Sequence, residues 1–138
     1  MAQIKKTNLL NVALIIYIVV VIVYGVFFLL APQLMAKASG SGPVASSWLR
    51  WPGGVLIALG VGAIMVYRNP LKQYVFVFTI TLGSLLAGLA LLFTLLFEME
   101  IGETWFTVLP VFILLILAVL LWFGSRQAKD ILCPKEEK

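Results

Sequence analysis

The feature that most constrains this chain is an uncharged apolar run near its beginning, "LLNVALIIYIVVVIVYGVFFLLA", which extends from Leu9 to Ala31. The run is rich in β-branched residues, which favour strands in soluble proteins. At about 23 residues it is far longer than a strand, and about 20 apolar residues are enough for a helix to cross a bilayer. The run therefore predicts a membrane-spanning helix, which Pro32 ends.

The composition extends this interpretation to the whole chain. Of its 138 residues, 62% are hydrophobic and 12% are charged, whereas soluble domains contain about 45–50% apolar and about 25% charged residues. We predict an all-α integral membrane bundle formed by a single domain over residues 1–138. Its four spans are expected at about residues 9–31, 51–67, 73–97 and 104–124, and residues 125–138 form a polar tail.

The beginning of the chain also imitates a cleavable secretory signal. Lys5 and Lys6 precede the apolar run, and "AKA" at Ala36–Ala38 resembles a cleavage site. The apolar part of such signals is about 7–15 residues long. Because this run is longer and Pro32 separates it from the small residues, we predict an uncleaved first span.

The connections between the spans differ in length. Residues 32–47, "PQLMAKASGSGPVASS", predict a loop that contains a short interfacial turn at Gln33–Lys37. Pro52 is expected in the first turn of the second span, where its missing N–H costs nothing. The link "RNPLK", residues 68–72, is so short that spans two and three should be antiparallel neighbours. Pro110 should bend the fourth span.

Basic residues are distributed unequally between the two ends of this bundle. With four spans, both termini lie on one side, and only Lys37 and Arg50 lie on the other. The terminal side carries the remaining eight of the ten basic residues: Lys5, Lys6, Arg68, Lys72, Arg126, Lys129, Lys135 and Lys138. The positive-inside rule therefore places both termini in the cytoplasm. The basic residues do not form a stripe interleaved with exposed aromatic residues, so no nucleic-acid partner is expected.

Several kinds of chemistry are excluded by residues that the chain lacks. It has a single cysteine, Cys133, so it can form no internal disulfide and contains no CxxC pair. It has no histidine, so a metal site with histidine ligands is excluded. No charged residue falls in the middle of a span, where proton-coupled transporters and voltage sensors need one. We also find no catalytic triad or phosphate loop. The sequence predicts no enzyme, no catalytic residue, no metal and no cofactor, and it leaves Cys133 as either a reduced thiol or an acylation site.

Arg50 is the residue that comes closest to suggesting a site. It lies near the positive end of the second span, where a cation is disfavoured, and on the side that has few basic residues. Glu98, Glu100 and Glu103 are expected at the same membrane level, and one of them could form an ion pair with Arg50. That pair is either a structural tie between spans or an outward-facing site for an anionic headgroup or small ligand. An arginine that reaches lipid phosphates is a further alternative.

Tryptophans mark the predicted outer interface. Trp48 and Trp51 flank Arg50, and Trp105 lies at the start of the fourth span. Because the amphipathic indole ring prefers the headgroup level of a bilayer, these three residues are predicted interface anchors.

Small residues recur at helical spacing in the second and third spans. Gly54, Ala58 and Gly62 fall on one face of span two. Span three carries the pairs Gly83–Ala87 and Ser84–Gly88 at the same spacing. Small residues four positions apart let helix backbones approach closely in lipid. This face therefore predicts close packing, either between spans two and three of one chain or against a partner subunit.

Two tyrosines lie seven residues apart on one face of the first span. Tyr17 should lie near the middle of the bilayer, where its hydroxyl needs a hydrogen-bond partner such as Thr79, Thr81 or Ser84. With Tyr24, it predicts either a packing face or a polar lining for a ligand.

The segments "YGVFFLLAPQLM", residues 24–35, and "RWPGGVLIALG", residues 50–60, resemble known proteins. They are similar to small uncharacterised four-helix inner-membrane proteins of bacteria, which include domain-of-unknown-function families and the DoxX-like group. In those proteins a first span ends in a proline, and a second begins with an arginine, a glycine pair and a later glycine. The resemblance implies a fold and a bacterial inner-membrane location rather than an activity.

Two functions are consistent with these observations. The small-residue faces and the lack of charge within the spans favour an accessory or scaffold subunit of a membrane complex, with other subunits or a second copy as partners alongside membrane lipids. The alternative is a small transporter, channel or lipid- or ligand-binding protein with an outward-facing site at Arg50 and the loop of Glu98–Glu103.

Overall fold

All regular structure in the described part of the chain is helical. The computed structural model describes residues 2–40, 45–97 and 105–134, and the side chains within 8–40, 45–97 and 108–134. The helices are α1 (Ala2–Leu30), α2 (Pro32–Ala38), α3 (Ser46–Arg68), α4 (Tyr74–Phe97), α5 (Trp105–Gln127) and α6 (Lys129–Leu132). Four of them, α1, α3, α4 and α5, are long and apolar enough to cross a membrane. This confirms the expected all-α fold of the described chain, with four helices that are long and apolar enough to span a membrane.

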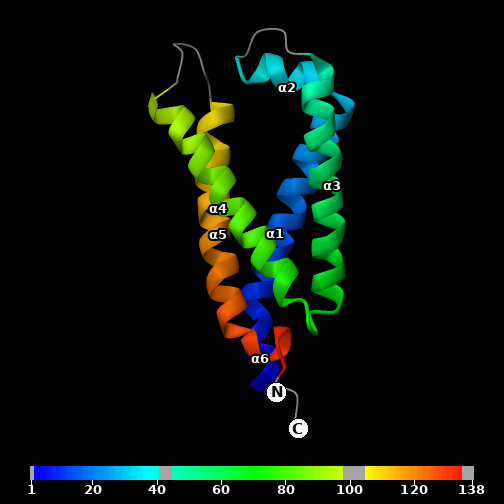
Figure 1. Cartoon of the computed structure of the whole chain (residues 1–138), viewed down its shortest axis with the longest axis vertical. Helices are drawn as coiled ribbons and strands as arrows, with labels where there is room; N and C mark the ends of the chain where they lie inside the picture. Colours follow the sequence, from blue (N-terminus) through cyan, green and yellow to red (C-terminus); the bar gives the residue numbers. More distant parts are fainter. Residues whose placement is uncertain (1, 41–44, 98–104, 135–138) are drawn as a thin grey trace.

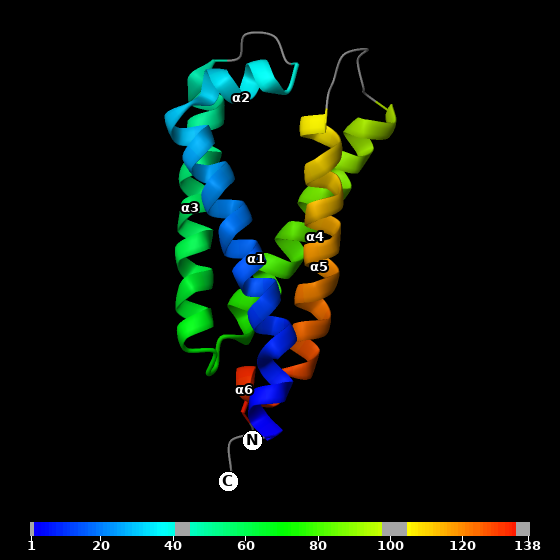
Figure 2. The same cartoon turned by 180° about the vertical axis from the view of Figure 1, so that it is seen from behind.

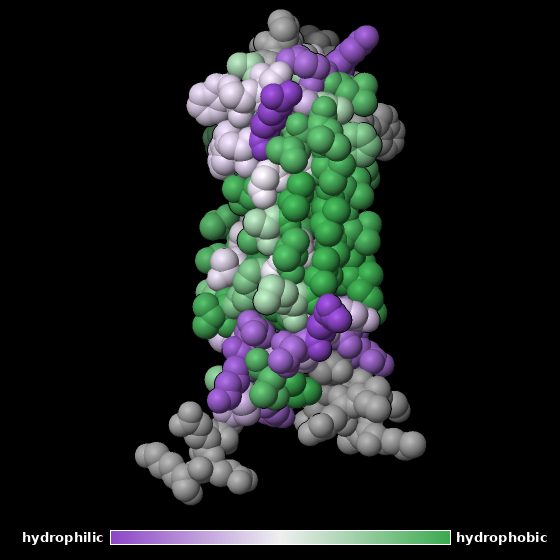
Figure 3. All heavy atoms as spheres, turned by 90° about the vertical axis from the view of Figure 1, so that its right-hand side faces the viewer, coloured by the Kyte–Doolittle hydropathy of each residue, from purple (hydrophilic) through white to green (hydrophobic). Residues whose placement is uncertain are grey.

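The surface has the distribution of polarity that a bilayer requires. A wide apolar band covers the middle of the long helices on the face shown in Figure 3, and hydrophilic residues border it at both ends. Within the bundle, the start of α1 and the short helix α6 lie at one end, which we call the termini end (Figure 1). Helix α2 lies across the opposite end, which we call the α2 end (Figure 1).

Three helix boundaries differ from the sequence prediction. Helix α1 begins at Ala2 rather than near residue 9. Helix α3 begins at Ser46 rather than near residue 51, so Pro52 lies in its second turn and not in its first. Proline removes a single backbone donor, and a helix this long and apolar continues through it. Helix α5 runs to Gln127, and α6 follows at once, so the segment after residue 124 is helical as far as Leu132 and is not simply a polar tail.

The link between α3 and α4 is a tight turn that also supports α6. The N–H of Asn69 donates to the carbonyl of Met65 over 2.9 Å, and its side-chain oxygen accepts from the N–H of Leu71 over 3.3 Å. Lys72 has a positive φ of 60° and its N–H donates to the carbonyl of Ile131 over 3.5 Å. The turn therefore holds α6 against the termini end of the bundle.

The long helices form two pairs. Helix α1 packs along α3, α4 packs along α5, and α1 also contacts α5. The pairs come together near the termini end and diverge towards the α2 end (Figures 1 and 2). Helices α3 and α4 run antiparallel, as expected for spans two and three (Figure 1). The expectation that they are neighbours in the packing is wrong, because they are joined by the short turn but touch little.

Glycines make both close crossings of α1. A Cβ atom at Gly53 in α3 would lie 2.9 Å from the carbonyl oxygen of Gly25 and 2.9 Å from the backbone nitrogen of Leu29. A Cβ at Gly124 in α5 would lie 2.8 Å from the Cα of Leu10. These distances leave no room for a side chain, so the two glycines let α3 and α5 lie directly against the backbone of α1.

Most of the small-residue face predicted on α3 does not pack against another described helix. Gly54 and Ala58 are exposed, and a Cβ at Gly54 would meet nothing within 4 Å. In α4, Gly83 and Ala87 are also exposed. Packing of spans two and three through these four residues is therefore wrong, and the alternative, a partner subunit, stays a prediction.

Two residues of the same predicted face do contact neighbouring helices. A Cβ at Gly62 would meet the ring of Phe76 in α4, at the termini end of α3. Gly88 is buried, and a Cβ there would lie 2.9 Å from the side chain of Leu115 in α5. Gly88 therefore belongs to the α4–α5 contact rather than to a contact with α3.

The hydrophobic core fills the half of the bundle next to the termini end. Helix α1 contributes Leu10, Leu14 and Tyr17 to it, and α6 closes it with the buried side chain of Leu132. The other helices add the residues Ala63, Val66, Val77, Ile80, Leu117, Leu121 and Ala128. Few of these lie towards the α2 end, and there the diverging helix pairs leave a cavity in place of a core.

Candidate functional site

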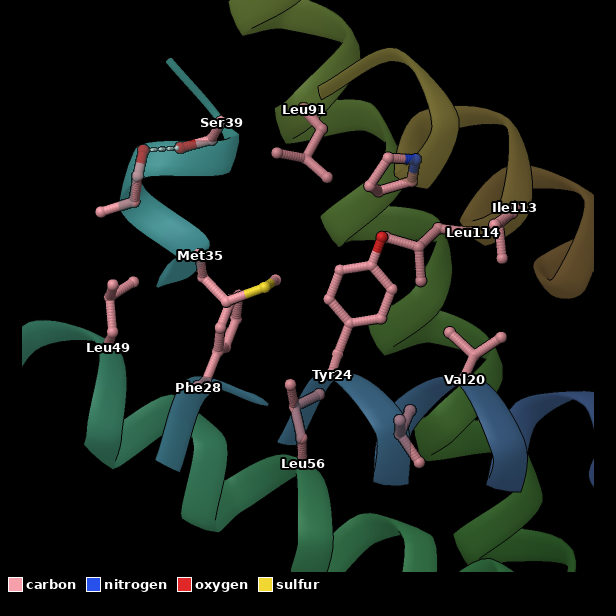
Figure 4. A pocket seen from close by; sticks show the side chains of 13 residues that line it. Val20, Tyr24, Phe28, Met35, Ser39, Leu49, Leu56, Leu91, Ile113 and Leu114 are labelled. Atoms are coloured by element: carbon pink, nitrogen blue, oxygen red, sulfur yellow. Dashed lines mark hydrogen bonds between the residues drawn. The ribbon is translucent and has the colours of Figure 1, made fainter. Parts of the chain in front are cut away.

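A pocket with a volume of about 350 Å³ lies between the two helix pairs in the half of the bundle towards the α2 end. Its lining side chains come from α1, α3, α4 and α5 and from α2 with the residue that follows it (Figure 4). The lining consists of Val20, Val21, Tyr24, Phe28, Met35, Ala36, Ser39, Leu49, Leu56, Leu91, Pro110, Ile113 and Leu114. Almost all of these side chains are apolar, and none of them carries a formal charge.

One wall of the pocket is a face of α1. Val20, Tyr24 and Phe28 follow one another at intervals of four residues, so they share one side of the helix. The rings of Tyr24 and Phe28 meet edge to face, with their centres 6.0 Å apart. The tyrosine side chain points across the pocket towards Leu114 of α5 (Figure 4).

Helix α2 forms the roof. Pro32 occupies its first turn, and Met35 and Ala36 turn inward and are buried over the pocket. The side-chain amide of Gln33 donates a hydrogen bond to the hydroxyl of Ser46 over 2.9 Å. This bond links the roof to the start of α3, which supplies the neighbouring lining residue Leu49.

The opposite wall comes from the second helix pair. Leu91 lies on α4, and Pro110, Ile113 and Leu114 lie on α5. Helix α5 continues through Pro110. Since α2 packs on α1 and α3, the roof and one wall belong to one helix pair, and the second wall belongs to the other pair.

Hydroxyl groups are the polar features of this lining. The Ser39 hydroxyl donates to the carbonyl of Ala36 over 2.9 Å (Figure 4). The Tyr24 hydroxyl forms no hydrogen bond with any residue that the structure describes. Ligand sites typically combine a mostly apolar lining with a few such groups, at volumes of about 300–1,000 Å³. The arrangement can therefore hold an apolar molecule and offer it a single tyrosine hydroxyl.

The predicted site at Arg50 does not coincide with this pocket. Arg50 is exposed in the second turn of α3, and its neighbour Leu49 lines the pocket while Arg50 itself does not. Glu98, Glu100 and Glu103 lie outside the described residues. An ion pair with Arg50, structural or functional, therefore stays a prediction.

Two of the three predicted interface anchors lie at the protein surface. Trp48 and Trp51 are strongly exposed near the start of α3, and the side chain of Trp105 lies outside the described part. Tyr17 is buried in the core and does not line the pocket.

The hydrogen bonds expected for Tyr17 do not form within the described chain. The hydroxyl of Thr81 donates to the carbonyl of Val77 in its own helix, and that of Ser84 donates to Ile80. Thr79 likewise bonds to the carbonyl of Val75. The prediction of a polar lining that includes both tyrosines is therefore wrong for Tyr17. Of the two tyrosines, only Tyr24 lines the pocket.

Most of the pocket was not found from the sequence. Two of its residues stand out in the sequence, because Tyr24 is a polar group within an apolar span and Pro110 interrupts the fourth span. Nothing in the sequence connected them, since they lie on different helix pairs that meet only in the folded bundle.

The residues of the described part also give no sign of a metal centre, because no three His, Cys, Asp or Glu side chains gather there.

No family model, curated protein or solved structure matches the chain. The resemblance to DoxX-like inner-membrane proteins therefore stays a prediction.

Proposed function

We propose that this chain is a small non-enzymatic membrane protein that binds an apolar ligand, such as a single hydrocarbon chain with one polar group, between its two helix pairs. The observation that supports this most is the pocket of about 350 Å³ beneath α2, with its apolar lining and the Tyr24 hydroxyl. The volume lies near the lower limit for small-molecule sites, which favours a single chain over a bulky ligand.

The ligand can be tested with a photoreactive fatty acid added to the purified full-length protein in detergent. We expect labelling that saturates at one molecule per chain and that an excess of unlabelled fatty acid prevents. Labelling that rises without saturation, as for a lipid that only surrounds the bundle, would contradict the proposal. The site differs from the outward-facing one predicted at Arg50, since Arg50 does not line it.

We further propose that both termini face the cytoplasm. Of the described basic residues, Arg68, Lys72, Arg126 and Lys129 belong to the termini end, whereas Lys37 and Arg50 belong to the α2 end. This bias supports a cytoplasmic termini end. Cys133 is exposed and is the only cysteine of the chain. A membrane-impermeant maleimide should therefore label it in inside-out vesicles and not in right-side-out vesicles, and the reverse result would contradict this topology.

A second candidate function is an accessory subunit of a membrane complex in a bacterial inner membrane. It is favoured by the exposed small residues Gly54 and Ala58 on α3, which no other helix of the described chain covers. If another membrane helix packs there, Ala58→Leu should release the partner and leave the bundle folded. Purification from native membranes in mild detergent as a lone monomer would contradict this role.

A further inference from the structure

A shallow groove of about 180 Å³ runs along the outer face of the α4–α5 pair, apart from the pocket under α2. It lies in the half of the bundle next to the termini end, because it uses the first half of α4 and the second half of α5. Its buried floor includes Thr81 and Ala118. Exposed apolar side chains form its sides, among them Leu82, Leu85, Val119 and Trp122.

An arginine stands at one end of this groove. The guanidinium carbon of Arg126 lies 4.8 Å from the centre of the Trp122 ring, one helical turn away on α5. Stacking on an aromatic face holds a guanidinium in place and leaves the N–H groups at its edge free to donate. Arg126 is exposed, and no carboxylate among the described residues forms an ion pair with it. The groove therefore ends at a cation that stacks on Trp122 and pairs with no carboxylate of the described residues.

The level of Arg126 along the helix matches the headgroup region of a bilayer. It is the second-last residue of the apolar span Val108–Gln127. The groove extends from this level into the apolar band, so its occupant needs a negative group at the interface and a hydrocarbon chain below it. A phospholipid has this arrangement, because its phosphate lies at the interface and its acyl chains extend into the apolar layer below.

We propose that the α4–α5 groove and Arg126 together bind one anionic phospholipid, with an acyl chain in the groove and the phosphate accepting hydrogen bonds from the guanidinium. Arginine can bind phosphate through two parallel hydrogen bonds. A zwitterionic lipid binds less well, because its cationic headgroup lies beside Arg126. This site is independent of the pocket proposed for an apolar ligand, and either can fail without the other.

Binding of the lipid can be measured by the fluorescence of Trp122, which lines the groove. Trp48, Trp51 and Trp105 are replaced by Phe, which leaves Trp122 as the only tryptophan in the sequence, and the protein is reconstituted in phosphatidylcholine vesicles. Phosphatidylglycerol or phosphatidylcholine with brominated acyl chains is then added at equal mole fractions, and quenching of the Trp122 fluorescence is measured. We expect brominated phosphatidylglycerol to associate about fivefold more strongly, the preference that one basic side chain near a bilayer surface confers.

Arg126→Gln should abolish this preference. Arg68→Gln is the matched control, because Arg68 is also an exposed arginine in the last turn of a spanning helix at the same end, but it lies on α3, which contributes no residue to the groove. The control should keep the preference. Equal quenching by both lipids, or equal loss in both variants, would overturn the proposal. Glycerol phosphate carries the phosphate without an acyl chain. If it displaced the lipid at a concentration equal to that of the lipid, the proposal would also be overturned, because an acyl chain in the groove would then add nothing to the binding.

Discussion

Gly53→Leu is expected to disturb the packing of α1 against α3 and to destabilise the bundle strongly. The Cβ atom alone would lie 2.9 Å from the carbonyl oxygen of Gly25 and 2.9 Å from the nitrogen of Leu29. Both are backbone atoms that cannot move aside without separating the helices. Overpacking of side chains costs about 1–3 kcal/mol, and a clash with backbone should reduce the free energy of unfolding by at least about 3 kcal/mol. Unfolding can be followed by circular dichroism during titration of detergent micelles with dodecyl sulfate.

Gly54→Leu is the matched control for this substitution. It adds the same side chain one residue later in α3, where a Cβ meets nothing within 4 Å and the helix surface is exposed. We expect its unfolding transition to lie close to that of the wild-type protein. If Gly54→Leu destabilised the chain as much as Gly53→Leu, the face that α3 turns towards α1 would be assigned incorrectly.

Val20→Trp is expected to reduce labelling by the photoreactive fatty acid about tenfold, which corresponds to about 1.4 kcal/mol of binding free energy. Val20 is half-buried and its side chain faces the pocket, so an indole ring there would take up much of the space that the ligand needs. The amount of label attached per chain, measured by mass spectrometry of the intact protein, checks this result.

Val19→Trp provides the comparison. Val19 is the preceding residue of α1, is 56% exposed, and does not line the pocket. The same ring placed there should lie in lipid and leave labelling unchanged. A similar reduction in both variants would mean that the fatty acid binds on the outer surface of α1 rather than in the pocket.

The spanning helices could be predicted from the sequence because each depends on a local property, a long apolar segment without charge. The connection at Arg68–Lys72 was also evident, since a five-residue link forces its two helices to run antiparallel. The packing of those helices could not be predicted in this way. A short link brings two helix ends together, but α3 lies along α1 because Gly25 and Gly53 face one another, and that pairing joins residues far apart in the chain.

The choice of the wrong glycine face has a simple geometric cause. In an α-helix with 3.6 residues per turn, Gly53 and Gly54 point about 100° apart. Only Gly54 begins a row of small residues four positions apart, with Ala58 and Gly62, so the spacing pointed to the face that does not meet α1. Only the position of Gly25 on α1 decides between them.

The pocket was beyond prediction for a related reason. A cavity depends on where packing stops, and here it stops because the helix pairs cross closely at Gly124 and Leu10 and then diverge. Side chains such as Leu56 and Ile113 are ordinary core residues by type. They line a pocket only because the opposite wall lies too far away to fill it.

The most direct measurement is the position at which the photoreactive fatty acid becomes attached to the wild-type protein. Digestion and peptide mass spectrometry should find the label on pocket residues from both helix pairs, such as Met35 or Leu56 on one side and Leu91 or Leu114 on the other. Label confined to outward-facing residues such as Val19, Val61 or Phe112 would contradict a ligand held between the two helix pairs.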